Sequence, residues 1–334
     1  MPIKSKIIFL IALFLLIFPV AYYLSTAEPT ARVISSYIED EGKMELYFCP
    51  GEDCTAALVD FLDSAEKSIH CAFYDIGLKE VQDKLLEKSK KMEVLIVTDD
   101  DYLKKFRHPF VKADKYGLMH NKFCIIDNQK VSTGSMNPTE NDAFKNNNNL
   151  LLIESEIISG NYEQEFQELW NGIFKDGETV KNSNIKLGNI LIETYFCPED
   201  SCAYRVKEEL KKAEKSIEFM TFSFTHEGIA NIILLKNSEG IAVKGIMETK
   251  QISQYSQFER LKHNGIEIIK DQNPNNLHHK VFIIDGETVI TGSFNPSANG
   301  DERNDENLVI IHDKAIAEKF MNEFNELYLQ WNQT

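Results

Sequence analysis

The stretch His278-His279-Lys280-Val281-Phe282-Ile283-Ile284-Asp285, followed by Gly292-Ser293-Phe294-Asn295, is one copy of a repeated pattern. The other copy has identical spacing and reads His120-Asn121-Lys122-Phe123-Cys124-Ile125-Ile126-Asp127, followed by Gly134-Ser135-Met136-Asn137. The apolar run after each lysine predicts a β-strand, in which alternate side chains share a face. The histidine and lysine of each motif should therefore project together, while Asn121 or His279 points away.

The two motifs belong to two homologous halves of the chain. Tyr47-Phe48-Cys49-Pro50 is matched by Tyr195-Phe196-Cys197-Pro198, and Ala-Glu-Lys-Ser-Ile occurs at 65–69 and again at 213–217. A helical segment closes each half, the first containing Trp170. Such self-similarity indicates an internal duplication. We expect an α/β protein with one domain at 32–184 and a second at 185–334.

The motif residues suit the cleavage of a phosphodiester bond. An imidazole can serve as a nucleophile or a proton donor near neutral pH, and a lysine ammonium can neutralise a non-bridging phosphate oxygen. Turn residues between each aspartate and glycine predict a hairpin that returns the serine and asparagine beside the histidine and lysine. The catalytic candidates are therefore His120, Lys122, His278 and Lys280. The candidate hydrogen-bonding ligands of the phosphate are Ser135, Asn137, Ser293 and Asn295.

On these motifs, both halves resemble the phospholipase D superfamily, whose signature is His-x-Lys-x4-Asp with a following Gly-Ser-x-Asn. Each half is most similar to the short bacterial endonuclease branch. The resemblance implies two α/β/α domains with mixed sheets, related by a pseudo-twofold axis and sharing one active site. It also implies catalysis without a metal or another cofactor. One histidine would form a covalent phosphohistidine, and the other would protonate the leaving oxygen and then activate water.

The halves differ in one element of the family pattern. Asn304-Asp305-Glu306-Asn307 contains the carboxylate that matches the one orienting the catalytic histidine, whereas the first half has Asn148 at that place. A nearby carboxylate raises the pKa of an imidazole. We therefore expect His278 to face Glu306, to rest protonated and to act as the acid. His120 should face Asn148, rest neutral and act as the nucleophile.

The remaining motif positions are Asp127 and Asp285, which we expect to support the site rather than to react.

The N-terminus carries an apolar run at 7–24, with Lys4 and Lys6 before it and Ser25-Thr26-Ala27 after it. The length of the run is at the lower limit for a helix that spans a bilayer. Its flanking charges place the N-terminus in the cytoplasm and the rest of the chain outside. The small-x-small ending also fits a signal-peptidase site. We expect residues 1–31 to be either a signal anchor that holds the protein on the extracytoplasmic side of the membrane or a cleaved signal peptide.

Cysteine pairs occupy matching places in the two halves, Cys49/Cys54 and Cys197/Cys202. In an exported chain, a local disulfide within each pair is the leading hypothesis. Free thiols and a four-thiolate zinc site are the alternatives, although the spacing is not the usual Cys-x-x-Cys. Cys71 and Cys124 lie in apolar strand-like runs, where we expect them to pack in the core.

The net charge of −16 argues against a general nucleic-acid binder, because such binding depends on neutralising phosphates with Lys and Arg. The stretch 102–122 is nevertheless basic. Its acidic residue is Asp114 alone, and its basic residues are Lys104, Lys105, Arg107, Lys112, Lys115 and Lys122.

Three functional hypotheses follow from these features. A phospholipid is the leading substrate, favoured by the predicted membrane attachment and the acidic chain. DNA or RNA is the alternative, favoured by the basic stretch and the endonuclease resemblance. A catalytically inactive binding module is suggested only by the missing carboxylate. Transfer to an alcohol other than water stays open, and the sequence shows no obligate protein partner.

Overall fold

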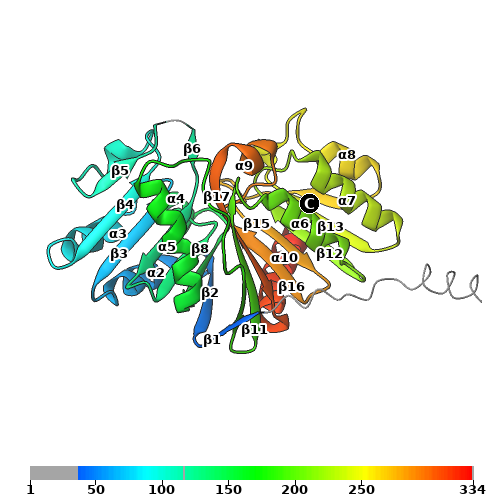
Figure 1. Ribbon diagram of the computed structural model, residues 1–334. Helices are drawn as coiled ribbons and strands as arrows, with labels where there is room; N and C mark the ends of the chain where they lie inside the picture. The colour runs from blue at the N-terminus through cyan, green and yellow to red at the C-terminus, as the bar shows by residue number, and fades with distance from the viewer. Residues whose placement is uncertain (1–36, 116, 333–334) are drawn as a thin grey trace, which may run out of the picture. The chain divides into compact units, whose positions relative to one another are not determined.

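The computed structural model describes residues 37–115 and 117–332, which form one compact unit. Within this part of the chain, the strands form a seven-stranded sheet and a ten-stranded sheet. Both sheets contain parallel and antiparallel pairs. Helices lie against these sheets (Figure 1). The protein therefore has the mixed α/β architecture that the sequence predicts.

The first sheet belongs to the half that carries His120. Its strands are β2 (Lys43–Cys49), β3 (Ser68–Phe73), β4 (Glu93–Thr98), β5 (Val111–Ala113), β7 (Lys122–Ile126), β8 (Lys130–Gly134) and β9 (Asn148–Glu154). Their order across the sheet is β2-β9-β8-β7-β3-β4-β5. All five residues of β7 are buried, as expected for a central strand covered on both faces.

The second sheet repeats this order. Its strands are β1 (Ile38–Asp40), β10 (Asn184–Leu187), β11 (Ile190–Cys197), β12 (Ser216–Thr221), β13 (Ala242–Met247), β14 (Glu267–Lys270), β15 (Lys280–Ile284), β16 (Thr288–Gly292) and β17 (Asn304–His312). The strands run β1-β10-β11-β17-β16-β15-β12-β13-β14, and β6 (Leu118–Met119) pairs with β17. From β11 to β14, each strand takes the place of its counterpart between β2 and β5. The repeat in the sequence is thus a repeat in the fold.

The boundary that the sequence suggests, between residues 184 and 185, falls within β10. In addition, β1 precedes that boundary yet pairs with β10 in the second sheet. The division into domains at 32–184 and 185–334 remains a prediction.

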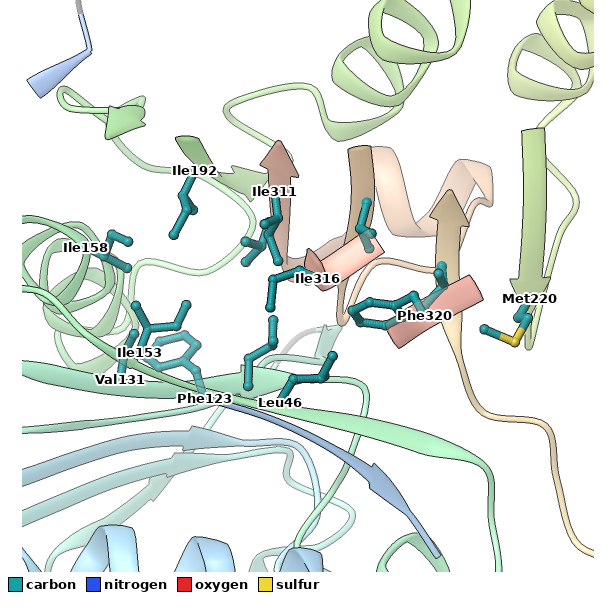
Figure 2. Packing of buried hydrophobic residues seen from close by; sticks show 14 of the residues in the cluster. Leu46, Phe123, Val131, Ile153, Ile158, Ile192, Met220, Ile311, Ile316 and Phe320 are labelled. Atoms are coloured by element: carbon teal, nitrogen blue, oxygen red, sulfur yellow. The ribbon is translucent and has the colours of Figure 1, made fainter. Parts of the chain in front are cut away.

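The longer helices are α2 (Cys54–Asp63), α3 (Lys79–Lys88), α5 (Glu156–Trp170), α6 (Cys202–Lys211), α7 (Glu227–Ser238) and α10 (Lys314–Trp331). The shorter ones are α4 (Glu140–Phe144), α8 (Phe258–His263) and α9 (Ala298–Glu302), with the 3₁₀ turns η1 (Leu103–Lys105) and η2 (Thr249–Gln251). Side chains of α5 and α10 share one hydrophobic core with both sheets. Figure 2 shows Ile158 of α5 and Phe320 of α10 in this core, with Phe123 of the first sheet and Ile311 of the second. The two halves are therefore held together by a common apolar interior.

Each motif lies on a hairpin, as predicted. β7 pairs antiparallel with β8, and β15 pairs antiparallel with β16. Each hairpin ends in a glycine with positive φ, 130° at Gly134 and 131° at Gly292. A Cβ atom would lie 2.5 Å from the Asn149 carbonyl oxygen in the first half and 2.4 Å from that of Asn307 in the second. Only glycine allows the chain to pass so close to the neighbouring strand before it reaches the motif serine.

Two backbone contacts cross between the halves just before each motif histidine. β6 pairs with the start of β17, and the His120 amide donates to the Asp305 carbonyl at 3.0 Å. In the other direction, Leu277 forms a parallel bridge with Asn147, and the His278 amide donates to the Asn147 carbonyl at 2.9 Å. Each histidine is thus attached to the opposite half of the protein.

Disulfides join Cys49 to Cys54 and Cys197 to Cys202, as the leading hypothesis expects. The expectation that Cys71 and Cys124 are only packing residues is wrong, because a third disulfide joins them. These two cysteines are directly opposite each other on the antiparallel strands β3 and β7. Among the described residues no cysteine is free, so no thiolate is left for the zinc alternative.

The apolar segment at 7–24 lies outside the described residues. No helix among those that the structure describes is both long and apolar enough to cross a membrane. The interpretation of residues 1–31 as a signal anchor or a signal peptide therefore remains a prediction.

The aspartate that ends each motif ties its hairpin to the turn before the neighbouring strand. Asp127 accepts hydrogen bonds from the backbone N–H groups of Glu66, Lys67 and Ser68 at 2.7–2.9 Å. Asp285 binds the equivalent backbone groups of residues 214–216. Burial opposes ionisation of Asp127, but the three N–H groups outweigh it and lower the pKa of this carboxyl. The supporting role of both residues is thus to fix the loops that carry the motifs.

Replacing Asp127 with alanine should lower the free energy of unfolding by about 2 kcal/mol, because three backbone donors lose a charged acceptor. Asp127→Asn should lower the free energy of unfolding less than this. Gln129→Ala, an exposed change in the same turn, should leave it unchanged. Because the pKa of Asp127 is lowered by folding, its contribution is complete above the ordinary value of 3.8 and is lost as the pH falls further. Urea unfolding of the three variants at pH 7 and pH 3 measures this, and equal stability of Asp127→Ala and wild type at pH 7 would contradict it.

Candidate active site

The two lysines of the motifs hold equivalent places at the first residue of β7 and of β15. Lys122 donates to the carbonyl oxygen of His120 at 2.6 Å, and Lys280 donates to that of His278 at the same distance. Each lysine is only 2% exposed. The strand geometry therefore places the histidine and lysine of each motif together, as the sequence predicts.

The histidines face partners from the opposite half. His120 Nδ1 lies 2.8 Å from a carboxylate oxygen of Glu306, and His278 Nδ1 lies 2.8 Å from Oδ1 of Asn148. The expected pairing, in which each histidine faces the residue of its own half, is wrong. It is reversed because the residues before each histidine pair with the strand of the other half that carries Glu306 or Asn148.

The hydrogen bonds define the tautomers of both rings. A carboxylate can only accept, so the Nδ1–H of His120 donates to Glu306. The amide of Asn148 is oriented by its Nδ2, which donates to the Asp142 carbonyl, and its Oδ1 accepts from Ser135 Oγ as well. The Nδ1–H of His278 therefore donates to Oδ1. In the neutral form, each ring leaves the lone pair of Nε2 free.

The expectation that His278 rests protonated is also wrong for this arrangement. Burial and then the charges of Lys280 and Lys122 lower the pKa of His278 well below 6.5. Burial lowers the pKa of His120 to about 4, although Glu306 acts in the opposite direction. These shifts favour the neutral form of both imidazoles at pH 7.

Burial also lowers the pKa values of the two motif lysines. Burial lowers the pKa of Lys122 to about 8. Burial, followed by the charge of Lys122, lowers the pKa of Lys280 from its ordinary value of 10.5. Two ammonium groups held together out of water are stabilised by a negatively charged ligand. The arrangement is therefore suited to bind a phosphate group between the two motifs.

The serines of Gly-Ser-x-Asn support the strands that carry the histidine partners. Ser135 Oγ accepts from the Asn149 amide at 3.0 Å, besides donating to Asn148, and Ser293 Oγ accepts from the Asn307 amide at 2.9 Å. Both serines are fully buried.

The asparagines of Gly-Ser-x-Asn differ from the serines. Asn137 donates from its amide nitrogen Nδ2 to Asp142 at 2.7 Å. The side-chain oxygens of Asn137 and Asn295 are buried and without a hydrogen-bond partner among the described residues.

The residues between His and Lys of each motif point away from the catalytic groups. Asn121 accepts from Nδ2 of Asn307 at 2.8 Å, and His279 accepts at Nδ1 from Nδ2 of Asn149 at 3.1 Å. His279 is completely buried. These contacts again run from one half to the other. The residue between His and Lys in each motif therefore helps to join the two halves.

Three further residues of the site were not predicted from the sequence. Tyr74 lies edge-on to His120 with ring centroids 5.0 Å apart, and Phe222 lies likewise to His278 at 4.8 Å. Both follow strands that match in the two halves, which is the signal that could have revealed them. The third is Asp142, whose carboxylate lies 3.6 Å from Nδ1 of His278.

Groups with metal-ligand spacing occur elsewhere among the described residues. They are Glu193/Glu209/His312, Asp99/Asp100/Asp114 and Glu165/Glu168/Glu199. The residues of the two motifs belong to none of these groups.

Comparisons with known proteins place both halves in one family. The family described as "Cardiolipin synthase, PLD-like domain" matches residues 58–170 and 206–328. A phospholipase D of Rickettsia conorii is 32% identical over 144 residues, which are 42% of this chain and 72% of that protein. A mitochondrial cardiolipin hydrolase of Xenopus tropicalis is 31% identical over 140 residues, 41% of this chain and 67% of that protein. Each of these relatives therefore matches about one half of the chain.

A solved structure matches both halves at once. The crystal structure of phosphatidylserine synthase from Haemophilus influenzae Rd KW20 aligns with 85% of this chain and 86% of that one, at a TM-score of 0.67. The identity is 12%, so this match shows a common fold alone.

Lys122→Ala and Lys280→Ala should each lower kcat by about 10²-fold or more, because each ammonium offsets charge on the phosphate in the transition state. Lys104→Ala, an exposed lysine in η1, is the matched control and should retain wild-type turnover. Steady-state hydrolysis of bis(p-nitrophenyl) phosphate, with circular dichroism to verify folding, measures the effect. Near-normal turnover of a folded Lys122→Ala or Lys280→Ala protein would remove that half from the site.

Proposed function

Because the chain belongs to the phospholipase D superfamily and is a phosphodiesterase hydrolase, we propose that it hydrolyses phospholipids through a phosphohistidine at one site shared by both halves. The observation that carries this proposal is the reciprocal attachment of the two motif histidines. His120 is held by Glu306 of the second half, and His278 by Asn148 of the first. Neither half alone contains a complete set of these contacts.

We assign His120 as the nucleophile, for a different reason from the one that the sequence suggested. Its Nδ1–H donates to Glu306, which leaves the Nε2 lone pair free to attack phosphorus. When Nε2 bonds to phosphorus, the ring acquires a positive charge. The carboxylate of Glu306 stabilises this charge, as an acidic partner does for an imidazolium in other triads. The Nδ1–H of His278 donates instead to the neutral amide of Asn148, and the carboxylate of Asp142 lies farther away, at 3.6 Å.

We assign His278 as the acid and then the base. The bound phosphodiester anion counteracts the lysines that lower the pKa of His278, so the ring can take a proton at Nε2. That proton passes to the leaving oxygen as the P–O bond breaks and the P–N bond to His120 forms. Neutral His278 then takes a proton from water, whose oxygen attacks phosphorus and breaks the P–N bond. The phosphate product leaves, and His120 regains its free Nε2 lone pair. His278 holds the proton taken from water and releases it to solvent as the anionic product departs.

Phospholipid is the substrate class that we propose. The relatives named phospholipase D and cardiolipin hydrolase support it, as does the net charge of −16. The basic stretch at 102–122 offers a nucleic acid less free charge than its composition suggests. Lys105 is paired with Asp75 at 2.7 Å, and Lys112 lies over the ring of Trp170 while donating to its carbonyl.

We also propose that residues 1–31 export the protein, either as an anchor or as a cleaved signal peptide. The charges around the apolar run at 7–24 support this orientation. The three disulfides support it independently, because disulfides persist in oxidising compartments outside the cytosol.

The substrate proposal is tested by supplying the full-length chain, in detergent micelles, with phospholipid vesicles and with single- and double-stranded DNA and RNA. EDTA is present throughout, because the proposed nucleophile and acid are imidazoles. We expect release of phosphatidate from the phospholipid and no cleavage of nucleic acid, with His120→Ala as the inactive control. Cleavage of nucleic acid without lipid hydrolysis would make the protein an endonuclease. Activity that requires an added divalent ion would contradict the imidazole mechanism.

A further inference from the structure

The two halves place their acidic residues differently around the site. At the position of Glu306, the first half has Asn148, and at the position of Asp142, the second half has Gly300. These positions match because each pair lies equally far beyond its motif glycine. Each half thus contributes one carboxylate to this region, but at different places along the chain.

Asp142 is a buried residue of the site and does not lie on the surface. It is 4% exposed and lies in α4, two residues beyond the exposed Glu140. Its Oδ2 accepts from the backbone amide of Asn137 at 2.8 Å and from the Nδ2 of the same residue at 2.7 Å. Its Oδ1 accepts from Asn146. Oδ2 lies 3.6 Å from the Nδ1 of His278.

Asp142 also orients the amide that holds His278. The carbonyl oxygen of Asp142 accepts from Nδ2 of Asn148 at 3.1 Å, which turns Oδ1 of Asn148 toward the histidine. The second half has no room for an equivalent side chain. A Cβ atom at Gly300 would lie 2.4 Å from the Asn295 carbonyl oxygen.

The largest influences on the pKa of His278 disfavour its protonation. Lys280, Lys122, His120 and His279 all act in that direction, in addition to burial. Asp142 is the negatively charged side chain that lies against its Nδ1. An imidazolium at this place needs an opposite charge, because an uncompensated buried cation is costly.

We propose that Asp142 is the positioning carboxylate of His278, taking over at a different chain position the role that Glu306 has for His120. It stabilises the protonated ring that delivers its proton to the leaving oxygen, and it orients Asn148 against Nδ1. The inference rests on the proposed function, because it needs His278 to be the acid. It predicts that Asp142 matters most when the leaving oxygen needs that proton.

The test compares two esters that differ only in the leaving group, methyl 4-nitrophenyl phosphate and methyl phenyl phosphate. The 4-nitrophenolate leaves without protonation, whereas the phenolate gains from it. In Asp142→Asn, kcat/KM should fall about 10-fold or more for the phenyl ester and less than about 3-fold for the nitrophenyl ester. Glu140→Gln, which removes a carboxylate from the same helix outside the site, should change neither value.

A second variant separates charge from structure. Asp142→Gly/Asn148→Glu gives the first half the residues that the second half has at Gly300 and Glu306. This double variant should recover most of the kcat/KM for the phenyl ester that Asp142→Asn loses. An equal loss on both esters in Asp142→Asn, or no recovery in a folded double variant, would overturn the proposal. A wild-type chain that hydrolyses neither ester would instead contradict the proposed function itself.

Discussion

The structure of the site depends on two backbone contacts that cross between the halves. The His120 amide is bound to the carbonyl of Asp305, and the His278 amide to that of Asn147. The residue that follows each of these carbonyls, Glu306 or Asn148, is the side-chain hydrogen-bond partner of the same histidine. Each half therefore completes the other, and the motifs cannot take their observed hydrogen bonds in a single isolated half. The shared apolar core around α5 and α10 keeps the halves in register for these contacts.

Charge is the second constraint, and it follows from the first. Bringing two motifs together buries two lysines and two imidazoles in one place, which lowers the pKa of Lys122 to about 8 and that of His120 to about 4. Glu306 and Asp142 oppose this effect on the lysines. In the proposed mechanism a phosphodiester anion opposes it further, so that binding of the substrate favours protonation of His278. The same electrostatics that disfavour charged histidines thus favour an anionic substrate.

The sequence predicted the features that depend on local spacing. Matched motifs predicted the hairpins, the duplicated α/β fold and the superfamily, and matched cysteine pairs predicted two disulfides. It failed where the answer depends on which segments meet. Spacing within one half cannot show that Glu306 approaches His120, since that follows from β6 pairing with β17. The bond between Cys71 and Cys124 needed the register of β3 and β7, and the burial of Asp142 needed the packing of α4.

The most direct test of a single site with His120 as its nucleophile is to locate the covalent phosphorus. His278→Ala and His120→Ala would each be mixed with bis(p-nitrophenyl) phosphate, stopped in denaturant at alkaline pH, and digested for mass spectrometry. Because the 4-nitrophenolate needs little protonation, His278→Ala should accumulate an adduct on His120, and at most one per chain. His120→Ala should form none. An adduct on His278 in the His120→Ala protein, or adducts on both histidines of the wild type, would contradict the account.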